Sequence, residues 1–319
     1  MLEEKTLMNN SAELDRIMTV VIPTLNEESG IAKVIEELHQ LGFKNILLID
    51  GYSKDKTVAV ATQLGAKVIY QQGKGKTGAL KTAVDAVDTP YMLVMDGDFT
   101  YDAASINRLL QHMTVYDEII GARVPTEKSS MTGLHKFGNS IITKVFNLLM
   151  NTNLSDVCSG MYILRTDTSR DLHLSTTGFD VEAEIAAQIA LSGRITEVPI
   201  NYRPRLGKQK LSTWKHGFKI IKSIVNLARS YNPGVFYSML GSLIIIPASL
   251  MLGASVVEWA LTGRISTPWF FIGISMVLVA IQAMGVGVMS LMLRRSELRS
   301  TRRLTKMLNS KSIQGQEIG

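Results

Sequence analysis

Two aspartates one residue apart, Asp96 and Asp98, are the side chains of this sequence best placed to do chemistry. They follow the apolar run Tyr91–Met95, which has the length of a buried strand. In an open α/β sheet, ligands bind at the carboxyl ends of the strands. Carboxylate oxygens at such an edge suit Mg²⁺ or Mn²⁺, which bind a few carboxylates together with substrate phosphates. The alternative interpretation is a solvated turn, because Asp-Gly is a common turn dipeptide.

Polar residues also follow two earlier apolar runs. Met18–Ile22 is followed by Pro23-Thr24-Leu25-Asn26-Glu27, and Asn45–Ile49 is followed by Asp50. Polar groups at the carboxyl ends of the first two strands are typical of a nucleotide site. Asp50 could accept a hydrogen bond from a base N–H or could cap the turn Gly51–Lys56, and the pattern does not decide between these roles.

Strand-like runs alternate with helix-like segments up to about residue 200. This alternation predicts a doubly wound α/β domain with a mostly parallel sheet and helices on both faces. The predicted strands are Met18–Ile22, Asn45–Ile49, Lys67–Tyr70, Tyr91–Met95, Glu118–Ala122, Met161–Leu164 and Ile195–Val198. The predicted helices are Gly30–Leu41, Lys56–Leu64, Thr77–Val87, Ala103–Met113, Phe137–Met150 and Asp180–Leu191.

Three familiar kinds of site are excluded. Gly73-Lys74-Gly75-Lys76-Thr77 contains the end of a P-loop, but the glycine that this motif requires at position 70 is a tyrosine. Glycines and lysines before a helix can still bind an anion through backbone N–H groups and charge. The single cysteine, Cys158, excludes an internal disulfide framework, and the five histidines lack metal-ligand spacing.

Charge is divided unevenly along the 319 residues. Residues 1–202 carry 18 Lys and Arg against 25 Asp and Glu, whereas residues 203–319 carry 16 against 3. No acidic residue lies between Val198 and Val257. An acidic part followed by a basic, apolar part indicates a membrane partner rather than nucleic acid.

Two uncharged runs, Val235–Val257 and Pro268–Leu293, exceed the roughly 20 residues that cross a bilayer. Basic residues precede the first run and follow the second, whereas the connection has only Glu258 and Arg264. The positive-inside rule therefore predicts a multi-pass protein of the cell membrane or an internal membrane, with the catalytic domain and both termini cytoplasmic. Two buried core helices are the alternative. The segment Trp214–Tyr231 has the apolar stripe and basic faces of a helix in the membrane interface.

The chain resembles the inverting glycosyltransferases of family two, and among them the dolichyl- or polyprenyl-phosphate sugar synthases such as dolichol-phosphate mannosyltransferase. The resemblance covers about residues 18–215, and its blocks occur in the expected order. The blocks are VVIPTLNEE at Val20–Glu28, IDGYSKDKT at Ile49–Thr57, GKGKTGALKTAV at Gly73–Val84, MDGDFTYD at Met95–Asp102, GAR at Gly121–Arg123, SDVCSGMY at Ser155–Tyr162, GFDVEAEI at Gly178–Ile185 and EVPINYRPRLGKQKLS at Glu197–Ser212.

The resemblance implies a Rossmann-like, nucleotide-sugar-binding domain of the GT-A type and a role for each matching residue. It implies Mg²⁺ or Mn²⁺ at Asp96 and Asp98, which match the metal-binding Asp-x-Asp. The remaining roles are a nucleoside site at Pro23, Leu25, Glu27 and Asp50, donor-phosphate contacts from Arg205 and Lys210, an acceptor-phosphate site at Arg123, Lys136 and Ser140, and a structural or donor-sugar role for Glu184.

Three positions depart from the family pattern. Gly51 replaces the usual second aspartate after the second strand, Thr100 the usual glutamine after Asp-x-Asp, and Gln209 the usual serine of the basic signature. A metal or diphosphate contact is therefore in doubt, and the donor preference could differ from that of better-known members.

The expected activity is transfer of a hexose, with inversion, from a nucleotide sugar (GDP-mannose or UDP-glucose) to a polyprenyl or dolichyl phosphate at the cytoplasmic membrane face. A processive polysaccharide synthase is one alternative, although its Gln-x-x-Arg-Trp block is absent. A catalytically silent membrane scaffold is another, and a homo-oligomer stays open. The expected parts are an N-terminal extension (1–17), the catalytic domain (18–212), the interfacial helix (213–232), a transmembrane hairpin (233–293) and a basic tail (294–319).

Overall fold

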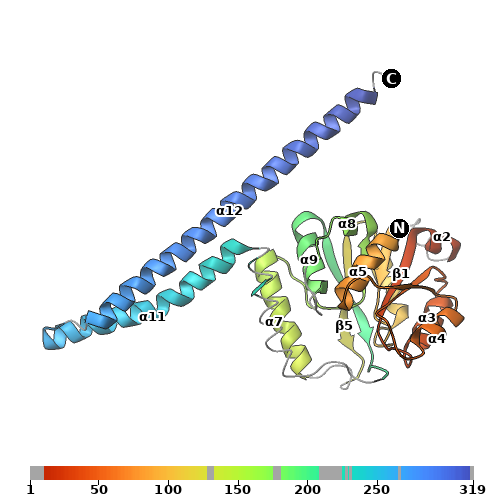
Figure 1. Cartoon of the computed structure of the whole chain (residues 1–319), viewed down its shortest axis with the longest axis horizontal. Coiled ribbons are helices and arrows are strands. Elements are labelled where there is room, and N and C mark those ends of the chain that lie inside the picture. Colours follow the sequence, from red (N-terminus) through yellow and green to blue (C-terminus); the bar gives the residue numbers. More distant parts are fainter. Residues whose placement is uncertain are drawn as a thin grey trace. The chain divides into compact units, whose positions relative to one another are not determined.

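The computed structural model describes residues 11–127, 133–174, 181–207, 225–226, 229, 232–264 and 267–316. The chain divides into two compact units, Met1–Ile224 and Val225–Gly319, and each is described by itself (Figure 1). The predicted interfacial helix Trp214–Tyr231 falls largely outside the described residues.

The first unit is built on a seven-stranded sheet of strand order β3-β2-β1-β4-β6-β5-β7. All seven predicted strands are present, and β6 alone among the paired strands runs antiparallel to its neighbours, β4 and β5. The prediction of a mostly parallel sheet is therefore confirmed. The strands are β1 (Met18–Thr24), β2 (Ile46–Asp50), β3 (Lys67–Tyr70), β4 (Tyr91–Val94), β5 (Glu118–Pro125), β6 (Tyr162–Arg165) and β7 (Ile195–Tyr202).

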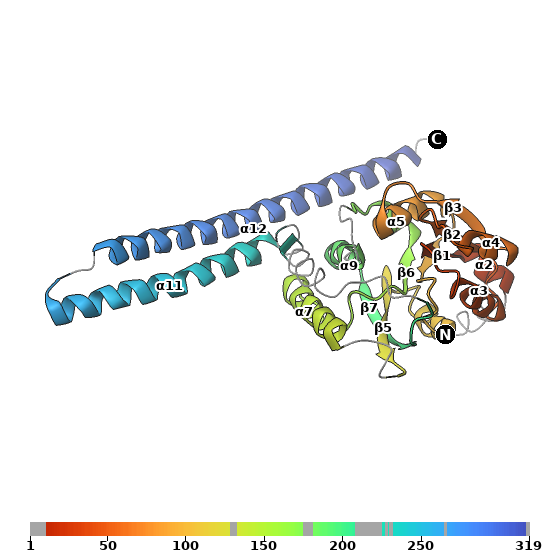
Figure 2. The same cartoon turned by 60° about the horizontal axis from the view of Figure 1, so that its bottom comes forward.

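Helices cover both faces of this sheet (Figure 2). The six predicted helices are present, although the one expected over Ala103–Met113 divides into a short 3₁₀ turn and α6. Two short helices, α2 and α8, were not predicted. The helical elements are α2 (Ser11–Ile17), α3 (Ile31–Gln40), α4 (Thr57–Gln63), α5 (Gly75–Ala86), η1 (Ala103–Ser105), α6 (Ile106–Leu110), α7 (Gly133–Met150), α8 (Thr166–Arg170) and α9 (Val181–Ser192).

The main core lies between the sheet and helices α3 and α6. Alternate residues of β1, Met18, Val20 and Ile22, are fully buried there, as the two-residue period of a strand requires. Helix α3 adds four buried residues spaced three or four apart, Ile31, Val34, Ile35 and Leu38. The buried residues thus recur at strand spacing in β1 and at helical spacing in α3, in agreement with the elements that the sequence predicts.

The second unit contains two long helices, α11 (Pro233–Thr262) and α12 (Thr267–Gln316). Two segments, Pro233–Thr262 and Pro268–Ser290, are long and apolar enough to cross a membrane. The helices pack closely through small residues: a Cβ on Gly241 would lie 2.9 Å from the carbonyl oxygen of Ala280. Helix α11 ends at Gly263, whose left-handed φ of 68° favours glycine.

Candidate active site at the carboxyl edge of the sheet

Three adjacent strands end at one place, which we call the carboxyl edge. Strands β2, β1 and β4 are parallel neighbours, so Asp50, Glu27 and the acidic pair Asp96 and Asp98 follow their ends on the same side of the sheet. Four described residues other than glycine have positive φ, and three of them lie here: Asn26 at 53°, Tyr52 at 66° and Phe99 at 66°. Backbone strain of this kind clusters at functional sites.

Asp98 is held by two partners of different kinds. Its Oδ1 accepts hydrogen bonds from the backbone N–H and hydroxyl of Thr100, at 3.1 and 2.6 Å. Its Oδ2 accepts from Nη1 of Arg205 at 2.8 Å. Burial and the nearby charge of Asp96 raise the pKa of Asp98, against the lowering effect of Thr100 and Arg205. A buried carboxylate with a raised pKa in a strained loop is a candidate functional group.

The segment after β7 carries Arg205 to the carboxyl edge. It runs beside the loop after β4, where Arg203 N–H donates to the Thr100 carbonyl at 2.7 Å and Leu206 N–H to the Asp98 carbonyl at 3.3 Å. Arg205 then bridges two carboxylates, because its Nη2 donates to Oε1 of Glu27 at 2.6 Å. The Nε of Arg205 is buried and has no hydrogen-bond partner among the described residues.

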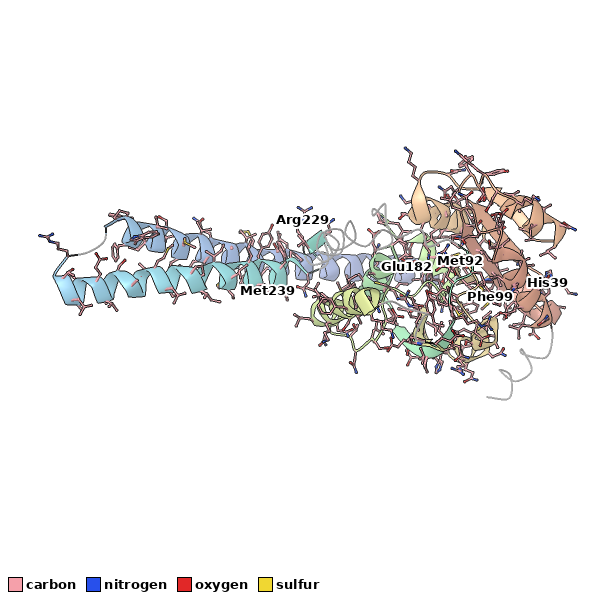
Figure 3. The ribbon with its side chains drawn as sticks, turned by 90° about the horizontal axis from the view of Figure 1, so that it is seen from below. His39, Met92, Phe99, Glu182, Arg229 and Met239 are labelled. Atoms are coloured by element: carbon pink, nitrogen blue, oxygen red, sulfur yellow. The ribbon has the colours of Figure 1, made fainter. Side chains whose placement is uncertain are left out.

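Asp96 is paired with a lysine to which the sequence assigned no role. Lys76, at the start of α5, places Nζ 2.6 Å from Asp96 Oδ1 and 2.6 Å from Glu182 Oε1 on α9, a residue labelled in Figure 3. Burial acts to lower the pKa of Lys76, but the two carboxylates raise it well above its usual value, so the ammonium stays charged. The sequence feature that could have identified Lys76 is its place in the Gly73–Val84 block, directly before the predicted helix Thr77–Val87.

The residues present fit a divalent cation in charge and donor chemistry. Among the residues that the structure describes, four carboxylates and two cations meet here, so carboxylate oxygens are the predominant charged groups. No group of three or more His, Cys, Asp or Glu ligands occurs in the part of the chain that the structure describes. Mg²⁺ nevertheless needs only one or two carboxylates beside substrate phosphates. The carboxylates are Glu27, Asp96, Asp98 and Glu182, and the cations are Lys76 and Arg205.

Asp50 has the turn-capping role in this structure. It is fully buried, and its Oδ2 accepts a hydrogen bond from Ser53 N–H at 2.8 Å. Beside it, Tyr52 and Tyr70 stack with ring centroids 5.4 Å apart, and both rings are more than half exposed. Pro23 is half-buried within β1, and Leu25 is exposed in the loop that follows. The carboxyl edge thus combines buried polar groups with an open aromatic surface.

Arg123 lies in a buried ion pair rather than on an open surface. Its Nε and Nη2 donate to the two oxygens of Asp156 at 2.6 and 2.7 Å, and its guanidinium faces the Tyr202 ring at 5.5 Å. Asn139 of α7 donates to the same carboxylate at 2.8 Å. Lys136 and Ser140 are exposed and lie four residues apart, so they share one face of α7, and Lys136 also lies one turn before Asn139. Asp156, which the sequence did not single out, joins these elements.

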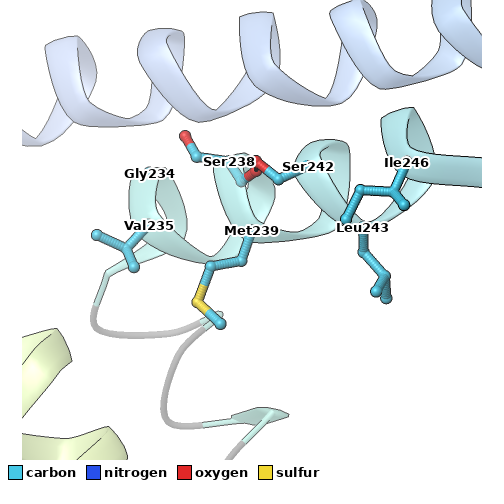
Figure 4. Close-up of a pocket in the computed structure, with 7 residues that line it drawn as sticks. All are labelled: Gly234, Val235, Ser238, Met239, Ser242, Leu243 and Ile246. Atoms are coloured by element: carbon cyan, nitrogen blue, oxygen red, sulfur yellow. Dashed lines mark hydrogen bonds between the residues drawn. The ribbon is translucent and has the colours of Figure 1, made fainter. Parts of the chain in front are cut away.

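The other predicted residues and a hollow on α11 add no further chemistry. Lys210 lies outside the described residues. Glu184 is buried on α9. The hollow is an open apolar surface of α11, shown in Figure 4, and holds none of the charged residues above. Its lining is Gly234, Val235, Ser238, Met239, Ser242, Leu243 and Ile246.

Comparison with known proteins identifies the family. The family described as Glycosyl transferase family 2 matches residues 19–172. The chain is 35% identical to the glycosyltransferase AglJ of Haloferax volcanii over 228 residues, covering 70% of this chain and 75% of that protein. It is 32% identical to a dolichyl-phosphate hexose transferase of the same organism, covering 66% of this chain and 93% of that one.

Solved structures show the same fold. Glucosyl-3-phosphoglycerate synthase from Mycobacterium tuberculosis, crystallised with Mn²⁺, UDP and glucosyl-3-phosphoglycerate, matches with a TM-score of 0.55 and 18% identity. The match covers 70% of this chain and 84% of that chain. The mostly parallel sheet therefore has the GT-A-like fold that the family resemblance implies.

Proposed function

The chain belongs to glycosyl transferase family 2, and we propose that it transfers a hexose from a nucleotide sugar to dolichyl or another polyprenyl phosphate. The dolichyl-phosphate hexose transferase of Haloferax volcanii supports the lipid acceptor. A dolichyl-phosphate beta-glucosyltransferase of Dictyostelium discoideum, 24% identical over 263 residues, gives the same support. The donor is GDP-mannose or UDP-glucose.

The nucleoside of the donor binds at the ends of β1 and β2. We assign Pro23, Leu25, Glu27 and Asp50 to this site, where Asp50 acts through the turn that it caps. The exposed side chains of Tyr52 and Tyr70 offer the base a flat apolar surface. Aromatic rings stack on every base, because each base has a π-face. Selectivity between nucleotide bases therefore depends on contacts to the edges of the base rather than on stacking against Tyr52 and Tyr70.

The donor diphosphate binds beside the acidic pair. A divalent cation at Asp96 and Asp98 offsets the charge that develops on the departing diphosphate. Arg205 supplies positive charge on the protein side through the two N–H arms that hold Asp98 and Glu27. The family resemblance assigns Lys210 to the donor phosphates as well. The carboxylate oxygens of Asp96 and Asp98 support the cation.

The acceptor phosphate binds near Arg123, Lys136 and Ser140. A phosphate monoester is largely ionised at neutral pH, because its second pKa is about 6, so its oxygen needs no strong general base. Catalysis then depends on in-line placement against the anomeric carbon and on cations around both phosphates. Direct displacement inverts the anomeric centre. Asp156 fixes Nε and Nη2 of Arg123, so among the described contacts the guanidinium nitrogen Nη1 is the one open to a phosphate.

The membrane part matches a substrate whose tail stays in lipid. Helices α11 and α12 span the bilayer as a hairpin over residues 233–293, and the catalytic domain (18–212) and both termini are cytoplasmic. The acid-free stretch from Val198 to Val257 and the basic residues after Leu293 support this orientation. From their sequence alone we assign residues 213–232 to the membrane interface, and residues 294–319 to a basic cytoplasmic tail.

The observation that carries the proposal is Arg205 bridging Glu27 and Asp98 at the carboxyl edge. The test incubates membranes containing the protein with labelled GDP-mannose, UDP-glucose and other nucleotide sugars, and then extracts the lipid phase. Label from one donor should enter the lipid phase only when polyprenyl phosphate and Mg²⁺ or Mn²⁺ are present. A silent membrane scaffold would transfer no label from any donor, and a polysaccharide synthase would release polymer instead.

A further inference from the structure

Lys76 is shared between two carboxylates beside the candidate metal site. Its Nζ lies 2.6 Å from Asp96 Oδ1 and 2.6 Å from Glu182 Oε1. The side chains of Lys76 and Glu182 are 14% and 6% exposed, whereas that of Asp96 is 32% exposed. The Lys76–Glu182 contact is therefore more deeply buried than the Lys76–Asp96 contact, and Asp96 is the more exposed of the two carboxylates.

The division of the Lys76 ammonium between two carboxylates affects how much negative charge Asp96 can offer to a bound cation. An ammonium bound to one carboxylate alone would neutralise it and would compete with any second cation for its oxygens. Glu182 engages part of the same ammonium, so Asp96 keeps charge for another partner. Glu182 also anchors Lys76 on the inner side, away from the exposed part of Asp96.

The second oxygen of Asp96 is confined by backbone. A Cβ on Gly160 would lie 2.3 Å from Asp96 Oδ2, so only glycine leaves room for this carboxylate. The hydroxyl of the buried Tyr101 accepts a hydrogen bond from Gly160 N–H at 2.6 Å and holds that backbone in place. Asp96 is thus oriented from both sides, by Lys76 at Oδ1 and by Gly160 at Oδ2.

We propose that Glu182 is a positioning residue for the divalent cation, which acts by holding Lys76 so that the ammonium does not engage Asp96 alone. This inference rests on the metal site of the proposed function, and it assigns Glu182 a role through its ion-pair partner Lys76. Residues behind a metal ligand commonly change metal affinity by about tenfold to a hundredfold when they are removed.

The test measures Mn²⁺ binding directly. The full chain, purified in detergent micelles, is titrated with Mn²⁺ in the presence of GDP or UDP, and free Mn²⁺ is followed by electron paramagnetic resonance. Glu182→Gln should weaken Mn²⁺ binding by about tenfold to a hundredfold. Lys81→Gln is the matched control, because Lys81 is an exposed lysine of the same helix as Lys76, and it should bind Mn²⁺ as the wild type does.

A double-mutant cycle separates action through Lys76 from a direct effect of the lost charge. In a Lys76→Gln background, Glu182→Gln should change Mn²⁺ affinity by no more than about twofold, the usual scatter of independent effects. An equally large loss in that background would overturn the proposal, because Glu182 would then act without Lys76. Unchanged Mn²⁺ affinity in the single variant, with lower thermal stability alone, would also overturn it.

The wild-type titration distinguishes this inference from the proposed function. Wild-type protein that binds Mn²⁺ with a nucleotide, while Glu182→Gln binds it equally well, would reject the role of Glu182 and leave the metal site standing. Wild-type protein that binds no Mn²⁺ with either nucleotide would reject the metal site and this inference together. Transfer of labelled sugar to lipid is measured separately and reports on the activity itself.

Discussion

Arg205 donates a hydrogen bond from Nη1 to Asp98 Oδ2 at 2.8 Å, although 107 residues separate the two in the chain. The same guanidinium reaches Glu27 Oε1 at 2.6 Å. One side chain from beyond β7 therefore joins the loops after β1 and β4. This pair of ion pairs links the loops at the carboxyl edge, and our proposal for donor binding depends on it.

Arg205→Lys should raise the KM for the nucleotide sugar by about tenfold to a hundredfold, with a smaller effect on the KM for lipid phosphate. A lysine ammonium lacks the two separate N–H arms with which the guanidinium of Arg205 reaches Asp98 and Glu27, so it would not keep both contacts in their present geometry. A charged hydrogen bond contributes about 1.5–3 kcal/mol. Arg203→Lys is the matched control, because Arg203 also bridges two carboxylates, Glu37 and Asp102. Equal changes in donor KM for both variants would contradict the assignment.

Gly160→Ala should abolish most transfer activity while the protein stays folded. The new Cβ would lie 2.3 Å from Asp96 Oδ2 and must displace that carboxylate. Gly133→Ala is the control, because no atom lies within 4 Å of its added Cβ. Activity and thermal unfolding are measured on both variants. Normal activity of Gly160→Ala would show that the position of Asp96 does not matter.

Asp156→Asn should destabilise the first unit by about 3–5 kcal/mol at neutral pH, because it leaves the buried Arg123 charge unpaired. Burial acts to raise the pKa of Asp156, but hydrogen bonds and charge from Arg123 outweigh it and hold that pKa below its ordinary value. A lowered folded pKa contributes stability above the unfolded value of about 3.9, and this stability is lost as pH falls. The stability difference from wild type should therefore shrink on acidification.

Thermal unfolding of wild type and Asp156→Asn between pH 7 and about pH 3 checks this expectation. Asp167→Asn serves as the control, because Asp167 forms an exposed pair with Arg165 and should change stability by less than about 1 kcal/mol. A stability difference that stays constant with pH would contradict the role of the Asp156 carboxylate.

Tyr52→Gly should weaken donor binding while leaving stability nearly unchanged. Glycine adopts the φ of 66° without the roughly 1–2 kcal/mol that a side chain costs there, and this gain offsets the roughly 0.5–1.5 kcal/mol of the lost stack on Tyr70. Equilibrium binding of GDP and UDP measures the effect, and base stacking contributes about 1–3 kcal/mol. Nucleotide binding at wild-type strength would remove Tyr52 and Tyr70 from the donor site.

The sequence predicted all seven strands because each is a short, largely apolar run between helix-like segments, and β1, β2, β4 and β6 are buried along most of their length. The reversed direction of β6 was not predicted, since an apolar run such as Tyr162–Arg165 indicates burial and not strand direction. Helix α8, Thr166–Arg170, was missed because one turn is too short to show a helical period. Apolar runs thus predict the elements, while pairing direction depends on contacts between distant segments.

Only part of the candidate site could be predicted, because some of its residues meet only through contacts between distant segments. Asp96 and Asp98 could be predicted because they directly follow the apolar run Tyr91–Met95, which places them at the end of a strand. Lys76 and Glu182 were missed as partners of Asp96, because α5 and α9 bring them together only in the folded sheet. The pairing of Arg123 with Asp156 likewise depends on β5 and the loop before β6 lying side by side.

The most direct test of the account compares wild type with Asp98→Asn in membranes supplied with the labelled donor, polyprenyl phosphate and Mn²⁺. Asparagine keeps the shape of the side chain but removes the charge that the cation and Arg205 share. We predict that wild type moves label into the lipid phase, that chelation of Mn²⁺ stops this transfer, and that Asp98→Asn loses at least about a hundredfold in rate. Undiminished transfer by Asp98→Asn, or wild-type transfer that ignores the chelator, would contradict the central claim.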